Sequence, residues 1–259
     1  MYNFISSRTN PTVQLLAGLD KKKTREETGL FLCEGRKLYR EAIGKCRVRY
    51  AVVREDKKES ELLSLCEESG GEVIVLSESA FAKISTDSAP DGVAFAVEIE
   101  KSSEESFEGE TVVMLDSVRD PGNVGTVIRS AAAFGYDRVI LCNCADVYNP
   151  KTVRATMGAL FNMKVTLCPS SGEMIKKLLS EGRRVIAAAL GESALTLGES
   201  ELLKSDCIVI GNEGHGVSKE TLEGCTHVIR IPMTDKTESL NAAIAASVIM
   251  WTQGMTGKK

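Results

Sequence analysis

The stretch Val112-Val-Met-Leu-Asp-Ser-Val-Arg-Asp-Pro-Gly-Asn-Val-Gly-Thr-Val-Ile-Arg129 decides the fold of the second half of the chain. Its first four residues are apolar and predict a buried strand. The alanine-rich segment that follows predicts a helix over residues 123–135, which Asn123 is expected to cap. A fully apolar strand that leads into a helix is typical of a parallel sheet with helices on both faces.

Strands and helices alternate along the rest of the chain as well. Apolar runs predict further strands at residues 30–35, 49–53, 73–76, 92–99, 138–142, 164–167, 184–190, 207–211 and 227–232. The segments between them predict helices at residues 11–29 (with a turn), 36–44, 59–69, 77–84, 150–160, 172–181, 218–223 and 239–252. Residues 101–110 are polar, lack periodicity and are expected to form a linker. The sequence therefore predicts an α/β protein with domains at 1–100 and 111–259.

The composition is that of an ordinary globular protein, with 259 residues of which 43% are hydrophobic and 26% charged. No apolar run reaches the ~18 residues of a membrane span. The N-terminus lacks the layout of a signal peptide, so we expect a cytoplasmic protein with no membrane partner. The eight cysteines form no Cys-x-x-Cys pair and only two histidines accompany them. We therefore expect buried free thiols and no metal site.

Charge is distributed unevenly along a chain whose net charge is −4. Residues 1–54 carry 12 Lys or Arg against 5 Asp or Glu, whereas residues 55–110 carry 4 against 16. A basic first part attracts phosphates, which favours a nucleic-acid partner. The same residues are also explained by a solvated surface, so charge alone leaves both interpretations open.

A second distinctive segment, Gly211-Asn-Glu-Gly-His-Gly216, follows a predicted strand. Three glycines in six residues predict a tight loop whose backbone comes close to another group. The segment matches neither the dinucleotide-binding nor the phosphate-loop pattern. Glu213 is costly in such a loop unless it accepts N–H groups or serves a ligand. His215 is either a general base or a solvent-facing loop residue.

A third segment, Ile231-Pro-Met-Thr-Asp-Lys-Thr-Glu-Ser-Leu-Asn241, follows the last predicted strand. Ser239 or Asn241 is expected to cap the small-residue helix after it. That helix could pack against a sister helix of another subunit. Because ligands of parallel α/β sheets bind beyond the carboxyl ends of strands, we expect the three segments to form the functional site.

In their order and spacing, the three segments resemble the three motifs of the SpoU (TrmH-like) RNA methyltransferases. The resemblance is carried by Asn123-Val-Gly-Thr-Val-Ile-Arg129, Gly211–Gly216, Ile231-Pro-Met233 and Ser239-Leu-Asn241, with residues 153–161 similar to the segment between the first two motifs. The N-terminal part is similar, more loosely, to the substrate-binding domain of the family through Ser7-Arg-Thr-Asn-Pro11, Arg25–Phe31 and Glu34-Gly35. Asp235 departs from the glycine that many members carry.

The resemblance implies a C-terminal α/β trefoil-knot (SPOUT) methyltransferase domain and a smaller N-terminal α/β substrate-binding domain. It implies S-adenosylmethionine as cofactor, methyl transfer to a ribose 2′-hydroxyl of RNA, and a homodimer formed through the knotted domain. Large-subunit ribosomal RNA is the preferred substrate. Transfer RNA and a non-catalytic RNA-binding relative are the alternatives. An unrelated metabolic α/β enzyme that uses His215 or a cysteine is the remaining rival.

The resemblance also implies which residues form the site. The residues expected to act in catalysis are Arg129, Asn123, Glu213, Ser239 and Asn241. The residues expected to bind the cofactor are Leu190, Gly191, Gly211, Ile231, Met233 and Leu240. In this family the arginine is implicated in removing the ribose proton, but a guanidinium stays protonated at all accessible pH. We therefore expect Arg129 to orient a phosphate and to stabilise the developing alkoxide.

Overall fold

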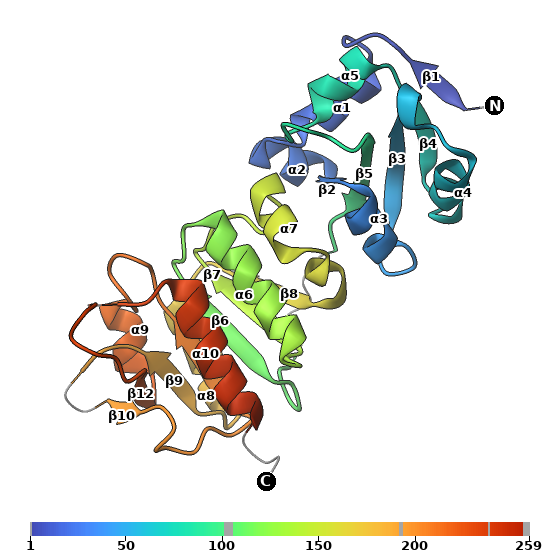
Figure 1. Cartoon of the computed structure of the whole chain (residues 1–259). Helices are drawn as coiled ribbons and strands as arrows, with labels where there is room; N and C mark the ends of the chain where they lie inside the picture. The colour runs from blue at the N-terminus through green and yellow to red at the C-terminus, as the bar shows by residue number, and fades with distance from the viewer. Residues whose placement is uncertain (1, 101–105, 192–193, 238, 256–259) are drawn as a thin grey trace. The chain divides into compact units, whose positions relative to one another are not determined.

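A computed structural model describes residues 2–100, 106–191, 194–237 and 239–255 of the chain (Figure 1). The chain divides into two units. The first holds residues 1–101 together with 146–161, and the second holds residues 102–145 and 162–259.

The second unit is built on a seven-stranded sheet in the order β10-β12-β9-β11-β6-β7-β8, in which every pair is parallel. Its strands are β6 (Val112–Asp116), β7 (Arg138–Cys142), β8 (Lys164–Cys168), β9 (Val185–Ala188), β10 (Leu195–Thr196), β11 (Cys207–Ile210) and β12 (His227–Arg230). All residues of β6, β7 and β11 are buried, as continuous apolar runs predict for a parallel sheet covered on both faces.

Helices cover both faces of this sheet (Figure 1). They are α6 (Pro121–Ala133), α8 (Ser171–Ser180), α9 (Lys219–Gly224) and α10 (Ala242–Met255). On one face, Met174 and Leu178 of α8 pack with Met114 of β6 in a buried cluster. On the other face, α6 and α10 pack against each other, and the Ser247 hydroxyl donates to the Ser130 hydroxyl at 2.9 Å.

The end of α10 is anchored by the buried side chain of Gln253. Its amide nitrogen donates to the carbonyls of Leu203 at 2.6 Å and Asp206 at 3.1 Å. Its amide oxygen accepts a hydrogen bond from the Tyr136 hydroxyl. These bonds satisfy a buried polar group and thereby hold the last helix against the unit.

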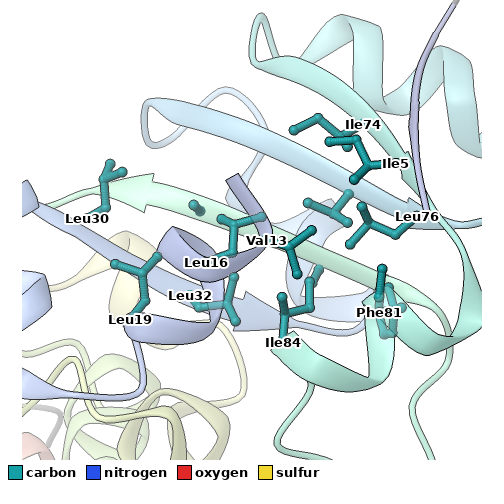
Figure 2. Packing of buried hydrophobic residues seen from close by; sticks show 14 residues of the cluster. Ile5, Val13, Leu16, Leu19, Leu30, Leu32, Ile74, Leu76, Phe81 and Ile84 are labelled. Carbon is teal, nitrogen blue, oxygen red and sulfur yellow. The ribbon is translucent and has the colours of Figure 1, made fainter. Parts of the chain in front are cut away.

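The first unit contains a mixed five-stranded sheet in the order β1-β4-β3-β5-β2. Its strands are β1 (Asn3–Ile5), β2 (Leu30–Glu34), β3 (Val48–Arg54), β4 (Glu72–Leu76) and β5 (Val93–Glu98). Its helices are α1 (Pro11–Gly18), α2 (Lys22–Thr28), α3 (Arg36–Ala42), η1 (Glu55–Lys57), α4 (Ser60–Glu68) and α5 (Glu78–Ile84). Figure 2 shows Val13, Leu16 and Phe81 in the cluster that packs α1 and α5 on the sheet.

The α/β class and most predicted elements are confirmed. β1 and β10 are not predicted from the sequence, because strands of three and two residues are too short to establish a period of two. Among the described residues, no helix is long and apolar enough to cross a membrane. All eight cysteines are free thiols, four of them buried and four partly buried.

The predicted domain limits miss one internal segment. Residues 146–161, which contain α7 (Pro150–Thr156) and most of η2 (Ala159–Asn162), belong to the first unit. The buried Arg25 forms an ion pair with Asp146 at 2.6 Å. The rings of Phe31 and Tyr148 lie 4.8 Å apart. A buried guanidinium requires a carboxylate partner, and here that partner lies 121 residues away, where no local pattern reveals it.

The expected linker is only partly described, because residues 101–105 lie outside the described residues. Its second half packs into the second unit. Phe107 is buried and lies beneath the Arg138 guanidinium, which is 5.3 Å from the ring centroid. A single aromatic residue in a polar segment produces no periodic pattern, so the sequence alone predicts a linker here and does not reveal the buried Phe107.

The ion pairs of Glu110 make the stability of the second unit depend on pH. The Glu110 carboxylate accepts hydrogen bonds from Arg138 Nε at 2.6 Å and Lys164 Nζ at 2.8 Å. Hydrogen bonding from Arg138 is the main reason that the pKa of Glu110 falls from 4.5 to about 2. A carboxyl group with a lowered pKa stabilises the fold above its unfolded pKa, and this contribution is lost as the pH falls through the folded pKa.

We predict that Glu110→Gln lowers the free energy of unfolding by roughly 1–3 kcal/mol at pH 7, because it removes a counter-charge from the buried Arg138. The difference from the wild-type protein should shrink as the pH falls from about 4.5 toward 2. Urea unfolding at a series of pH values measures both effects. A difference that stays constant across this range would contradict the assigned role of the ion pairs.

Candidate functional site

Three neighbouring strands bring the expected cofactor residues to one edge of the sheet. Ala188 of β9 is paired with Ile210 of β11 and with Ile229 of β12. Leu190-Gly191, Gly211 and Ile231 directly follow these three strands, so parallel pairing places them together at the carboxyl edge. Leu190 is 67% exposed. Ile231, Met233 and Leu240 are half-buried.

The loop that follows β11 closes tightly on itself. Asn212 and Gly216 exchange two backbone hydrogen bonds, each of 2.9 Å. A Cβ atom on Gly211 would lie 2.2 Å from the backbone of Gly216 and Val217, which leaves no room for any side chain. The expected close backbone approach is therefore present, and within the described residues the loop makes it with its own chain.

A polar chain joins the three sequence segments. The Asn241 side-chain amide donates to Asn123 Oδ1 at 2.9 Å. The Asn123 amide in turn donates to Glu213 Oε1 at 2.9 Å. The backbone N–H groups of Arg119 and Asp120 complete the environment of Glu213, each at 3.4 Å. Residues 90 and 118 positions apart in the sequence thus meet in one hydrogen-bonded chain.

The electrostatics of Glu213 follow from these donors. Partial burial raises its pKa, but the hydrogen bonds from Asn123 and from backbone N–H groups outweigh burial, so the pKa lies below its ordinary value. The carboxylate is therefore ionised at neutral pH and occupied as an acceptor. It orients Asn123 and is poorly suited to remove a proton from a bound molecule.

The helix caps differ from the sequence prediction at one position. Asp120, not Asn123, caps α6, and its carboxylate accepts from the backbone N–H of Asn123 at 2.9 Å. Pro121 occupies the first helical position, which proline favours, and the helix thus begins two residues earlier than expected. Asn123 lies in the first turn with its side-chain amide available to Glu213 and Asn241. The cap of α10 is Asn241, whose side chain accepts from Ala243 N at 2.9 Å.

Two of the expected catalytic residues lie outside this polar chain. Arg129 is exposed on α6 and forms no hydrogen bond or ion pair with any residue in the described part of the chain. Ser239 is exposed, and its backbone carbonyl accepts from the Thr237 hydroxyl at 3.0 Å. The structure thus brings Asn123, Glu213 and Asn241 together and leaves Arg129 available to an external anion.

The structure does not support the alternative of a metabolic enzyme that uses His215 or a cysteine. His215 is exposed, and its Nδ1 lies 3.4 Å from Asn212 Oδ1, which fits a loop residue. Burial raises the pKa of Cys207 and of Cys225 to about 12, so both thiols stay protonated at neutral pH. Within residues 2–100, 106–191, 194–237 and 239–255, no group of three or more His, Cys, Asp or Glu side chains could hold a metal ion.

Sequence reasoning missed two polar residues beside the site. Asp116 ends β6 and is 2% exposed. Asn212 donates from its amide to the Ser117 carbonyl at 2.8 Å. One feature of the sequence could have identified Asp116: a carboxylate stands at the end of an otherwise apolar strand. A charge buried at such a position requires several hydrogen-bond partners.

Comparisons with known proteins show which family the chain resembles. Residues 110–251 match the SpoU rRNA Methylase family, and residues 10–94 match the MRM3-like substrate binding domain. The chain is 32% identical over 252 residues to the 23S rRNA (guanosine(2553)-2'-O)-methyltransferase RlmP of Bacillus subtilis, covering 95% of this chain and 97% of that protein.

Solved structures of similar proteins share the fold. The AdoMet-bound rRNA methyltransferase from Sinorhizobium meliloti superimposes with a TM-score of 0.86 at 30% identity, covering 97% of each chain. The SpoU methyltransferase AviRb from Streptomyces viridochromogenes, in complex with AdoMet, gives a TM-score of 0.85 at 26% identity, covering 95% of this chain and 97% of AviRb.

We predict that Gly211→Ala opens the loop and lowers the melting temperature, because the new methyl group overlaps the backbone of Gly216. The cost should be on the order of 1–3 kcal/mol, typical of overpacking. Gly214→Ala is the matched control, since its Cβ would meet only Asn212 Oδ1 at 3.6 Å. Thermal unfolding measures both variants, and equal melting temperatures would refute the close-packing argument.

Proposed function

This chain belongs to the SpoU rRNA methylase family, and we propose on that premise that it methylates a ribose 2′-hydroxyl of large-subunit ribosomal RNA with S-adenosylmethionine. The observation that carries the proposal is the hydrogen-bonded chain Glu213–Asn123–Asn241. It joins all three segments at the carboxyl edge of the sheet, beside the loop that follows β11. AdoMet-bound relatives of the same fold support the cofactor.

The strand-end residues fit S-adenosylmethionine. Gly211 carries no side chain, which lets the loop fold back onto the end of β11 and so shapes the edge of the site. Ile231, Met233 and Leu240 are half-buried apolar residues that would offer a surface to the adenine. Leu190 and Gly191 would close the site from the neighbouring strand. The bound cofactor would supply an electrophilic methyl group on a sulfonium.

The protein residues would act mainly by positioning and charge. Arg129 has a free guanidinium that would bind an RNA phosphate and stabilise negative charge developing on the ribose oxygen. Ionised Glu213 and capping Asn241 would fix the amide of Asn123 beside the reacting groups. Ser239, exposed in the loop before α10, would contribute a hydroxyl. Much of the rate enhancement would come from holding the two reactants in line.

The trefoil knot is part of this proposal. β12 lies near one edge of the sheet, whereas α10 contacts α6 and β11 in its middle. Residues 231–237 therefore have to lead back across the carboxyl ends of the strands. Threading behind the 211–216 loop accounts for this path, although chains rarely knot.

A homodimer is proposed from the exposed surface of α10. Ile244, Val248 and Trp251 are 54%, 37% and 55% exposed. Their spacing places them on one face of the helix, and such an apolar stripe is typically covered by a partner. A second copy of this chain would cover it, with α10 near its symmetry axis.

The first unit would hold the RNA. Its match to a substrate-binding domain supports this role, together with the excess of basic residues in positions 1–54. Ribosomal RNA is preferred to transfer RNA because RlmP, similar over nearly its whole length, is named for 23S rRNA. A cytoplasmic location follows from this choice of substrate.

We predict that Arg129→Lys lowers the rate of methyl transfer by at least about tenfold, because an ammonium cannot reproduce the planar fork of a guanidinium. The melting temperature and the affinity for S-adenosylmethionine should stay unchanged, since Arg129 has no partner within the described residues. The measurement is transfer of a labelled methyl group to total RNA from cells that lack the gene, followed by mapping of the modified nucleotide.

Each outcome of this experiment is informative. Ribose methylation mapped to the large ribosomal subunit supports the proposal, whereas a product in transfer RNA overturns the choice of substrate. Absence of transfer by the wild-type protein favours the non-catalytic alternative. Wild-type turnover by Arg129→Lys would refute the special role of the guanidinium.

We also predict that Trp251→Glu converts a dimer to a monomer, because it places a charge in the apolar stripe of α10. Sedimentation velocity at micromolar protein concentration measures the change. The exposed Leu167 lies on β8 and not on α10, so Leu167→Glu is the matched control that should leave the dimer intact. A wild-type monomer would contradict the proposed assembly.

A further inference from the structure

The buried carboxylate of Asp116 lies at the end of β6, directly behind the site. Its Oδ1 accepts from the Ser171 hydroxyl at 2.7 Å and from the Ser117 hydroxyl at 3.2 Å. Its Oδ2 accepts from the backbone N–H of Ser218 at 3.3 Å, and the Thr221 hydroxyl also donates to the carboxylate. An ionised carboxylate with several donors is stable in a buried position.

The pKa of Asp116 is consistent with that environment. Burial raises the pKa, but the hydrogen bonds from Ser171, Thr221 and Ser218 together lower it below its ordinary value. The group therefore carries a full negative charge at neutral pH, with acceptor oxygens only.

The next residue, Ser117, has a left-handed backbone conformation, which residues other than glycine rarely adopt. Its φ is +60°. Its N–H donates to the Cys142 carbonyl at 2.8 Å, and its own carbonyl accepts from the Asn212 amide at 2.8 Å. The left-handed conformation thus directs the Ser117 carbonyl to the loop that follows β11.

Together these bonds attach both ends of the loop to two consecutive residues. Asn212, at the start of the loop, is held by the carbonyl of Ser117. Ser218, at its end, is held by the carboxylate of Asp116. Between these ends, Glu213 meets the polar chain through Asn123. The loop position therefore depends on the end of β6.

We propose that Asp116 is a positioning residue for methyl transfer, whose carboxylate holds the 211–218 loop in the geometry that binds the cofactor and presents Glu213 to Asn123. This inference rests on the proposed function of the loop. Asp116→Asn preserves shape and size but removes the negative charge and leaves one acceptor oxygen in place of two. A neutral amide oxygen holds the N–H of Ser218 more weakly than a carboxylate does, and it is shared among the remaining donors, so the end of the loop is loosened.

The test compares Asp116→Asn with Ser171→Ala in the full-length protein. Ser171→Ala removes a hydrogen bond to the same carboxylate but leaves both loop attachments intact. Two quantities are measured: the Kd for S-adenosylhomocysteine by calorimetry, and amide hydrogen exchange over residues 211–218. We expect Asp116→Asn to raise the Kd by about tenfold and to accelerate exchange in the loop. Ser171→Ala should change neither quantity. This difference should hold even if both variants lower the melting temperature by the same amount.

The outcomes separate the inference from the proposed function. Absence of binding by the wild-type protein would overturn the assigned function. Wild-type binding with unchanged Kd and unchanged loop exchange in Asp116→Asn would overturn the positioning role alone. Equal effects of Asp116→Asn and Ser171→Ala on both quantities would show a general structural role and would also overturn it.

A second pair of variants covers the case in which Asp116→Asn does not fold. Ser218→Pro removes the N–H that donates to Asp116, and the φ of Ser218, −62°, is already compatible with proline. Ser218→Ala keeps the N–H and equally loses the hydroxyl cap of α9. Weaker binding in Ser218→Pro than in Ser218→Ala supports the positioning role, and equal binding refutes it.

Discussion

The hydrogen-bonded chain from Glu213 through Asn123 to Asn241 is the constraint on which the rest of the site depends. Two of its side chains also fix a backbone element: Glu213 accepts from the N–H groups that precede α6, and Asn241 caps α10. The same bonds therefore assemble the site and hold the loop after β11, the start of α6 and the start of α10 in register. An error in one of the three elements would leave a polar group without a partner.

The charged residues of this chain differ in whether the fold already supplies them with a partner. Asp116 and Glu213 are ionised and occupied by donors, and in both cases hydrogen bonds outweigh the effect of burial on the pKa. The buried Arg25 is likewise engaged by Asp146. Arg129 is exposed and has no partner among the described residues. A preorganised site with an available guanidinium is suited to an anionic ligand, because the protein need not break its own ion pairs to bind it.

Much of the fold could be predicted because its determinants are local. Apolar runs such as β6 and β11 identified buried parallel strands, and the glycines of the 211–216 loop indicated a close backbone approach. The cap of α6 was misplaced by three residues, since both Asp120 and Asn123 are good capping residues. Pro121 favours the earlier start, and the position of Asn123 in the first turn makes its side chain available to the site.

Local sequence patterns are enough to establish the α/β class, the order of the elements and the three segments that carry the family motifs. The contacts of Asn123 with Glu213 and Asn241, and of Asp116 with Ser218, become visible only in the folded chain. The same holds for the assignment of residues 146–161 to the first unit. The difference arises from the separation of the interacting residues along the sequence. Periodicity and capping depend on neighbours within about four residues, whereas the three side-chain contacts of the site join residues 90 to 118 positions apart and form only when the sheet is packed.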